Sequence, residues 1–458
     1  MEHYRGPTFD GPAVIMIADG WTRRIFLELL GAGDLPEIAD LFEQDAERSG
    51  FLDVISNLPT VSLASHTTIL TGTHQAEHGV VGHRWLDSAT NSRRDYLGVS
   101  GPKQVNRDIR RDVPTVFEHY KHAVSVQSVI RRGAQQHVSL PTIRSGPILR
   151  KAGDLLVRQP DSLVVAWLPR GDILAHTYGP DSARVRRDMQ ETSVAIGQLA
   201  RRLEGSGLLA KTRLLLIPDH GHRAVSQTVN LKRLLRDIGI DTAINRRPTK
   251  SNQTLTLTSG DSSALLYLSE RDRSRLTVIA NQVAQLACVE LVCAPVGRDR
   301  LLFFSHQGAA SATYDWAEGS VSYEVDDGED PLGLDVGPRS VLNLQSPMLT
   351  GKYPDVLHQI ARSFASGRSG DLLLLAAAGT HFGRTPRLAF RFGYHRGSHG
   401  GPFPDEILVS AGFRLPSGER MPDRSPIRSA DLLRALGFLP IGATVASPTT
   451  RTLLATSS

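Results

Sequence analysis

Short apolar runs alternate with segments of helical period at both ends of the chain. Residues 13–18 are apolar at every position, and 163–168, 213–217 and 371–376 are apolar at nearly every position. A strand without a polar face has to be covered on both sides, as in the parallel sheet of an α/β protein. We therefore predict a mostly parallel central sheet with helices on both faces.

The segments between these runs have the apolar spacing of amphipathic helices. One such helix is predicted over 35–48, with Pro36 near its first turn. Others are predicted over 181–203 and 429–436. These helices would supply the layers that cover the sheet.

The pattern changes between about residue 239 and residue 365. "QTLTLTSG", "DRLLFFS" and "SVSYEVDD" read as strands, and residues 272–287 read as a helix, before strand-like sequence resumes at "GDLLLLAAAG". We therefore predict a first part of a catalytic core over 1–238, an inserted smaller α+β cap over 239–365, and a second part of the core over 366–458.

Composition narrows the class of protein. A chain of 458 residues is longer than one hydrophobic core usually supports, so we expect two domains or one domain with a large insertion. Its 40% apolar and 22% charged residues are ordinary for a globular enzyme. The net charge of +5 is small, and the arginine-rich stretches 108–113 and 184–188 also carry acids. We interpret both as solvated helix faces and expect no nucleic-acid polymer as a partner.

The chain shows no sign of export or of a disulfide framework. Cys288 and Cys293 lie five positions apart in an apolar stretch and are expected to be buried thiols. The N-terminus is polar, Asp19 ends the first apolar run, and no later run approaches the roughly 20 residues that span a bilayer. These features predict a cytoplasmic protein without a membrane partner.

Acidic and imidazole side chains follow the predicted strands. Asp19 follows the first strand, the pair Asp219 and His220 follows 213–217, and Asp172 comes shortly after 163–168. Ligands collect at the carboxyl ends of parallel strands. Each acid alone is more often a helix cap or turn residue, but the repeated occurrence, with His399 in "GSHGG", favours a metal site with nitrogen and oxygen ligands.

Spacing adds to this interpretation. Asp172 and His176 lie four residues apart, on one face of a helical turn. Ser62 precedes "LASHTTILTG", a predicted helix whose first amides and dipole would favour an alkoxide and a bound phosphate. The plain alternative is that Ser62 is only an N-cap.

The ordered motifs resemble those of a known family. Strand–Asp–Gly, Pro-Thr-x-Ser, Asp-x-x-x-His, Asp-His-Gly and a late Ser-His-Gly are similar in order and spacing to the alkaline phosphatase superfamily. Its most similar branch is the type I phosphodiesterase and nucleotide pyrophosphatase group, which includes phosphonoacetate hydrolases. The resemblance covers about 1–235 and 366–458.

The resemblance implies two divalent metal ions, for which zinc is expected and manganese or iron remains open. It implies that three residues hold the first ion: Asp172, His176 and His399. It implies that the second ion is held by Asp19, Asp219, His220 and the oxygen of Ser62. Ser62 would also be the nucleophile that forms a phosphoserine intermediate.

One position departs from the family pattern. Where the family often places an asparagine that holds a phosphate oxygen, this chain has His83, which we expect to bind substrate by a hydrogen bond or a positive charge. The histidines outside the ligand set are expected to be structural: His66, His74 and His78.

We therefore expect a two-metal hydrolase of a small-molecule phosphate ester or phosphonate, with phosphodiester or pyrophosphate cleavage preferred because of the family branch. A phosphonate C–P hydrolase and a phosphomonoesterase of the same superfamily are the alternatives within this class. A sulfatase is disfavoured because "SLASH" lacks the proline and arginine of the sulfatase motif. From another class, the chain would be a catalytically silent binding protein on the same fold. The sequence indicates neither the substrate nor the oligomeric state.

Overall fold

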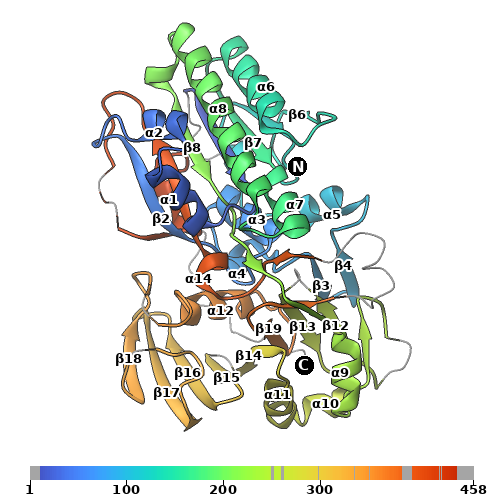
Figure 1. The fold of residues 1–458 in the computed structure, drawn as a ribbon. Helices are drawn as coiled ribbons and strands as arrows, with labels where there is room; N and C mark the ends of the chain where they lie inside the picture. Colours follow the sequence, from blue (N-terminus) through green and yellow to red (C-terminus); the bar gives the residue numbers. More distant parts are fainter. Residues whose placement is uncertain are drawn as a thin grey trace.

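Two large sheets separated by helices make up the protein in the computed structural model (Figure 1). The structure describes residues 11–248, 252–258, 262–297, 299–334, 336–349, 351–383, 395–421, 423 and 425–440. The first sheet has eight strands and the second has nine.

The eight-stranded sheet is the predicted central sheet. Its strands, in spatial order, are β23 (Ile427–Arg428), β2 (Ser49–Ile55), β22 (Leu408–Arg414), β8 (Arg213–Ile217), β1 (Ala13–Ala18), β7 (Ser162–Leu168), β5 (His122–Val126) and β6 (Gln136–Val138). Only β22 runs against its neighbours β2 and β8. The mostly parallel α/β fold predicted from the apolar runs is confirmed.

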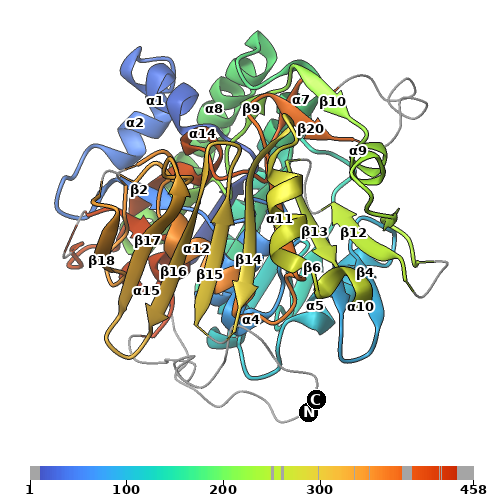
Figure 2. The same cartoon turned by 90° about the horizontal axis from the view of Figure 1, so that it is seen from below.

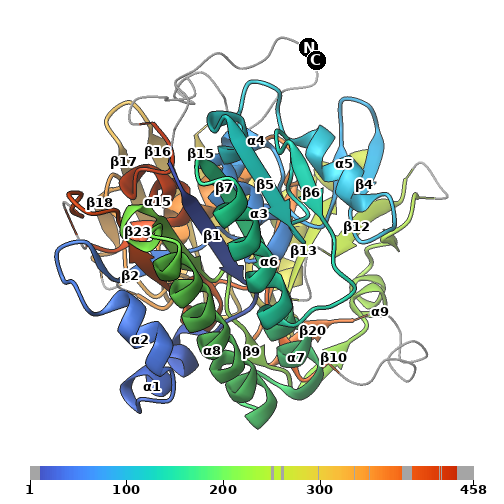
Figure 3. The same ribbon diagram turned by 90° about the horizontal axis from the view of Figure 1, so that it is seen from above.

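Strand β1 shows why this sheet is apolar on both faces. Ile15 and Ile17 belong to the core between the two sheets, whereas Val14 and Met16 face an outer layer of helices. Figure 3 shows the long helices of that layer crossing the strands. The outer layer contains α1 (Arg23–Gly31), α2 (Pro36–Phe42), α6 (Ser145–Arg158) and α8 (Ala183–Gly205).

Helices between the sheets share one core with both of them. Their buried side chains belong to the same apolar cluster as Ile15 and as Leu265 of the second sheet. This middle layer contains α3 (Ser62–Thr71), α4 (Gln75–His78), α12 (Val356–Phe364) and α15 (Ser429–Ala435). Since α3 is anchored from both sides, its N-terminus is held firmly against the first sheet.

The nine-stranded sheet is mostly antiparallel (Figure 2). In spatial order it contains β11 (Thr242–Ile244), β12 (Thr254–Thr258), β13 (Ser263–Tyr267), β19 (Leu372–Ala376), β14 (Val289–Val296), β15 (Arg300–Phe304), β16 (Gly308–Asp315), β17 (Ser320–Gly328) and β18 (Arg339–Asn343). Its outer face is covered by α9 (Leu231–Asp237) and α11 (Leu276–Ala284). Three two-stranded sheets pair β3 (Arg84–Asp87) with β4 (Ser92–Asp95), β9 (Arg223–Ala224) with β21 (Gly397–Ser398), and β10 (Gln227–Val229) with β20 (Thr380–Phe382).

The placement of 371–376 in the central sheet was wrong. β19 pairs with β13 and β14, so it is a central strand of the second sheet. Leu373 faces the middle layer and Leu374 faces α11, so this strand is also buried on both sides. An apolar run in the sequence indicates that a strand is buried on both faces, but it does not show to which sheet the strand belongs. The boundaries 1–238, 239–365 and 366–458 remain a prediction.

Two predicted helices are shorter in the structure. α2 ends at Phe42 rather than at residue 48, because the polar stretch that follows offers no apolar face to pack. The segment predicted over 272–287 forms α10 (Glu270–Arg273) and then α11. In the described ranges, no helix is both long and apolar enough to cross a bilayer. The cytoplasmic location stays a prediction.

A buried carboxyl group lies where α14 (Pro404–Ile407) leads into β22. Glu406 accepts a hydrogen bond from the Gly401 amide at 3.0 Å through Oε1, and its side chain is otherwise enclosed. Burial raises the pKa of Glu406 to about 7. The folded protein therefore holds this proton more tightly than the unfolded chain does.

Glu406 makes stability depend on pH. The protonated carboxyl of Glu406 stabilises the folded state because its pKa is higher there than in the unfolded chain. This stabilisation is complete below pH 4.5, the ordinary pKa of glutamate, and is lost as the pH rises through about 7. Glu406→Gln keeps a neutral acceptor for Gly401, so we expect it to exceed wild type in stability by about 3 kcal/mol at about pH 8. The difference should shrink as the pH falls toward 4.5 in urea unfolding series. Glu43→Gln is the control, because Glu43 is exposed. If the free energy of unfolding changed with pH equally in Glu406→Gln and wild type, Glu406 would not be the source of the pH dependence.

Candidate active site

The carboxyl ends of three neighbouring strands converge on one site. Asp19 directly follows β1, and Asp219 with His220 follows β8. After β7, helix α7 (Arg170–Tyr178) carries Asp172 and, as predicted, His176 one turn later. Because β8, β1 and β7 are adjacent in the sheet, their carboxyl ends bring these residues together. His399 reaches the same place from the loop after β21.

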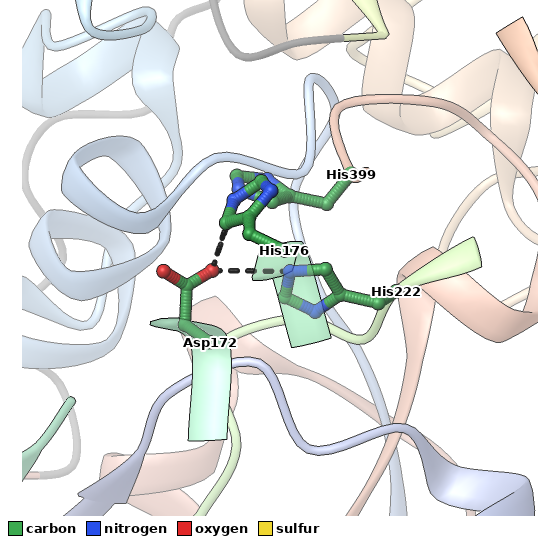
Figure 4. Close-up of side chains that lie close together, drawn as sticks. All are labelled: Asp172, His176, His222 and His399. Carbon is green, nitrogen blue, oxygen red and sulfur yellow. Dashed lines mark ion pairs between the residues drawn. The ribbon is translucent and has the colours of Figure 1, made fainter. Parts of the chain in front are cut away.

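The first group of side chains surrounds the Asp172 carboxylate. Its members are Asp172, His176, His222 and His399, whose possible ligand atoms all lie within 4.8 Å of one another. Asp172 Oδ1 lies 3.1 Å from His222 Nε2, 3.3 Å from His176 Nε2 and 3.6 Å from His399 Nε2. Figure 4 shows the carboxylate pointing toward the rings of His176 and His222.

The second group lies around His220. Its Nε2 is 3.1 Å from Ser62 Oγ, 3.4 Å from Asp219 Oδ2 and 3.7 Å from Asp19 Oδ1. The remaining carboxylate oxygens are held from outside, since Trp167 Nε1 donates to Asp19 Oδ2 at 2.7 Å and the Gly20 amide donates to Asp219 Oδ1 at 3.1 Å. One oxygen of each carboxylate is thus fixed and the other faces the cluster.

Backbone carbonyls orient all four imidazoles. A carbonyl oxygen only accepts, so each Nδ1 beside one carries a proton and each ring turns Nε2 toward the carboxylates. This is the arrangement of metal-binding histidines. The four pairs are His176 with Gly397 at 2.9 Å, His399 with Thr60 at 2.7 Å, His222 with Gly20 at 3.1 Å and His220 with Gly221 at 3.1 Å.

Burial sets the electrostatics of the site. It raises the pKa of Asp19 well above its ordinary value, and the neighbouring Asp219 and Asp172 carboxylates raise it further. Burial lowers the pKa of His220, and it lowers that of His399 well below the ordinary value, where neighbouring imidazoles add to the effect. These rings are therefore neutral near pH 7, the form in which imidazole binds a metal.

The donor set fits divalent cations. In the two groups, three enclosed carboxylate oxygens have no hydrogen-bond partner: Asp19 Oδ1, Asp172 Oδ1 and Asp219 Oδ2. Burying such groups without compensation costs several kcal/mol each. Cations between these oxygens and the imidazole nitrogens would compensate them, and this mixture of ligands suits zinc, manganese or iron.

Ser62 does not act as a helix cap. The N-cap position of α3 is Val61, and the Ser62 hydroxyl is directed at His220 instead of at the amides of its own helix. The amide of the next residue, Leu63, donates to His83 Nε2 at 3.5 Å. The structure thus brings His83 beside the predicted nucleophile.

Two residues near the clusters were not in the predicted set. His222 follows His220 by two residues in the loop after β8, a proximity that the sequence already shows. His66 follows Ser62 by one helical turn, and its Nε2 lies 3.1 Å from Asp219 Oδ2, although it was expected to be structural. His78, by contrast, bonds to Thr68 at 3.0 Å within the core.

A family model and several named relatives match this chain. The model of the type I phosphodiesterase / nucleotide pyrophosphatase family matches residues 13–402. An uncharacterised pyrophosphatase/phosphodiesterase of Schizosaccharomyces pombe is 24% identical over 234 residues, which cover 46% of this chain and 45% of that protein. A bis(5'-adenosyl)-triphosphatase of Mus musculus is 22% identical over 53% of each chain. The matched stretches thus span about half of these relatives' length.

Structural likeness extends further than sequence likeness. Murine ectonucleotide pyrophosphatase/phosphodiesterase 5 has a TM-score of 0.58 at 13% identity, covering 94% of this chain and 96% of its own. Phosphonoacetate hydrolase from Sinorhizobium meliloti, solved with phosphonoformate, has a TM-score of 0.57 at 16% identity over the same shares. At such identities the likeness establishes the fold. Together with the family model over most of its length, it shows that this chain belongs to the type I phosphodiesterase / nucleotide pyrophosphatase family.

Proposed function

We propose that the protein is a two-metal hydrolase that cleaves phosphodiesters or pyrophosphates through a phosphoserine at Ser62. The observation that carries this proposal is the position of Ser62 Oγ, 3.1 Å from His220 Nε2 and at the start of a helix. The helix N-terminus favours the alkoxide of a hydroxyl placed there, and cations bound among the adjacent carboxylates and imidazoles would favour it further.

Each of the two groups of side chains would hold one of the two proposed ions. The first ion is assigned to Asp172, His176 and His399, and the second to Asp19, Asp219, His220 and Ser62. When bound, divalent ions at these places would act as Lewis acids toward the Ser62 hydroxyl and the phosphate oxygens. Zinc is the proposed ion on the grounds of its nitrogen and oxygen ligands.

The chain's own residues would then position the reacting groups. Ser62 Oγ forms a bond to phosphorus, and the ester oxygen on the opposite side leaves with a proton. Water next breaks the bond between Ser62 and phosphorus and restores the hydroxyl. The Leu63 amide and His83 lie beside Ser62, and a phosphate oxygen bound there would replace the contact that they make with each other.

The names of the relatives favour a diester or pyrophosphate over a phosphonate. The Schizosaccharomyces pombe relative is named a pyrophosphatase/phosphodiesterase, and the Mus musculus relative a bis(5'-adenosyl)-triphosphatase. The murine structural neighbour was also solved with AMP, whereas the Sinorhizobium enzyme was solved with phosphonoacetate. The small-molecule phosphate ester is therefore our proposed substrate class, with phosphonate cleavage as the alternative. The convergence of all the predicted ligands on one site supports an enzyme over a silent binding protein.

A substrate panel tests the proposal. We expect an aryl phosphodiester and a nucleoside triphosphate to turn over faster than an aryl phosphomonoester or phosphonoacetate. A chelator should remove all of these activities, and zinc should restore them, because the buried carboxylates need cations to hold their geometry. Faster release of phosphate from phosphonoacetate would favour the phosphonate hydrolase. Activity that survives exhaustive chelation would contradict the two-metal proposal.

Replacement of Ser62 tests the nucleophile. Ser62→Ala should lower kcat by about 10³-fold or more, because no hydroxyl remains to form the intermediate. Ser62→Thr should keep part of the activity. Ser65→Ala is the matched control, since Ser65 is buried in the same helix and contacts Ser56 rather than the cluster. Mass spectrometry of acid-quenched reactions should detect the substrate's phosphoryl group, with the ester group that has not left, on wild type and Ser65→Ala but not on Ser62→Ala. Near wild-type rates in Ser62→Ala would rule out the phosphoserine.

Substitution of His83 tests whether this residue sets the substrate preference. A histidine can add a positive charge beside the phosphate, which favours the more anionic monoester. His83→Asn keeps a hydrogen-bond donor without that charge. We expect it to raise the ratio of diester to monoester kcat/KM by about 10-fold, the effect of about 1.4 kcal/mol. His137→Asn, on β6 outside the clusters, is the control. An unchanged ratio would mean that His83 does not contact the substrate.

A further inference from the structure

We propose that His222 is a fourth protein ligand of the first ion, together with Asp172, His176 and His399. The inference rests on the proposed two-metal function and adds a residue that the family resemblance does not supply. His222 lies in the loop after β8, two residues beyond His220, and its side chain is fully buried.

Distances place His222 as an equal member of the first group. Its Nε2 is the imidazole nitrogen that lies closest to Asp172 Oδ1, at 3.1 Å. Its ring centroid is 4.9 Å from that of His176 and 5.0 Å from that of His399, and the latter two are 5.0 Å apart. The three rings therefore surround one small space that Asp172 closes (Figure 4).

The orientation of the His222 ring favours a cation in that space. His222 Nδ1 lies 3.1 Å from the Gly20 carbonyl oxygen, so this contact turns Nε2 toward the first group. Nε2 is enclosed without a hydrogen-bond partner. It faces Asp172 Oδ1, another enclosed atom without a partner. A cation between these two atoms would bind both of them.

A purely positioning role accounts less well for the same contacts. If Nε2 of a neutral His222 carried the proton and donated it to Asp172, Nδ1 would be an acceptor. It would then face the Gly20 carbonyl oxygen, which is also an acceptor. That arrangement leaves the Gly20 carbonyl facing an atom that cannot donate to it.

The backbone at Gly20 leaves room for the imidazole ring of His222. Gly20 has φ +73°, and a Cβ added there would lie 2.5 Å from Cε1 of His222. The His222 amide donates to Thr22 Oγ1 at 3.1 Å, which fixes the loop on the other side. The turn after β1 therefore holds the imidazole at its place.

The fourth ligand would make the two ions electrically different. The first group supplies one carboxylate and three imidazoles, whereas the second supplies two carboxylates, one imidazole and the Ser62 oxygen. A divalent ion in the first group would thus keep more positive charge. It would be the stronger Lewis acid toward a phosphate or leaving-group oxygen.

A metal titration tests the proposal without reference to turnover. Apo protein is titrated with Zn²⁺ in competition with a chromophoric chelator, for wild type, His222→Ala and the control His119→Ala. His119 is also buried but lies in the 3₁₀ turn Val116–His119, outside the clusters. We expect His222→Ala to weaken one of two ions by more than about 100-fold, beyond the usual effect of an outer hydrogen-bond partner. The other ion and the control should keep wild-type affinities.

A second measurement covers the case in which His222→Ala does not fold. Wild type labelled with nitrogen-15 histidine and loaded with NMR-active cadmium should show a one-bond coupling between cadmium and Nε2 of His222. A loss of 100-fold or less in His222→Ala, or a His222 signal without cadmium coupling, would overturn the fourth ligand while leaving the two-metal function intact. Wild type that binds no ion would overturn the proposed function itself.

Discussion

Three carboxylates that converge on one small space are the constraint on which the site depends. Asp19, Asp172 and Asp219 reach this space from neighbouring strand ends, and each presents one enclosed oxygen without a hydrogen-bond partner. Burial and the other two carboxylates raise the pKa of Asp19 well above its ordinary value. Cations bound among the carboxylates and imidazoles would relieve this repulsion.

The fold provides what this arrangement requires. Adjacent parallel strands end at the same edge, so the acids converge without long side chains. Outer contacts then fix each ligand: Trp167 and the Gly20 amide hold carboxylate oxygens, and backbone carbonyls hold the imidazole Nδ1 atoms. Helix α3, packed between the two sheets, brings Ser62 to the cluster from the other side. The rigidity of both cores is therefore part of the geometry of the site.

Much of this was predictable because it follows from local rules. Apolar runs located β1, β7 and β8, and the polar residues after them located Asp19, Asp172 and Asp219. The remainder depends on tertiary structure. β19 is apolar on both faces, but only pairing partners distant in the sequence assign it to the second sheet. His222 and His66 become ligand neighbours through a loop turn and a helix orientation that no single-residue pattern specifies.

The functional predictions divide in the same way. The family and the α/β fold are established by comparison over most of the chain, whereas ligand roles, the phosphoserine and the substrate class remain proposals. His83 illustrates the difference, because its departure from the family pattern was visible in the sequence, but its place beside the Leu63 amide required the structure.

Anomalous diffraction from crystals of the zinc-loaded protein would show whether ions bind at the two groups. We expect two zinc peaks, one within bonding distance of Asp172, His176, His222 and His399 and one within bonding distance of Asp19, Asp219 and His220. Crystals with ordered side chains at both groups but no anomalous peak at either would contradict this expectation.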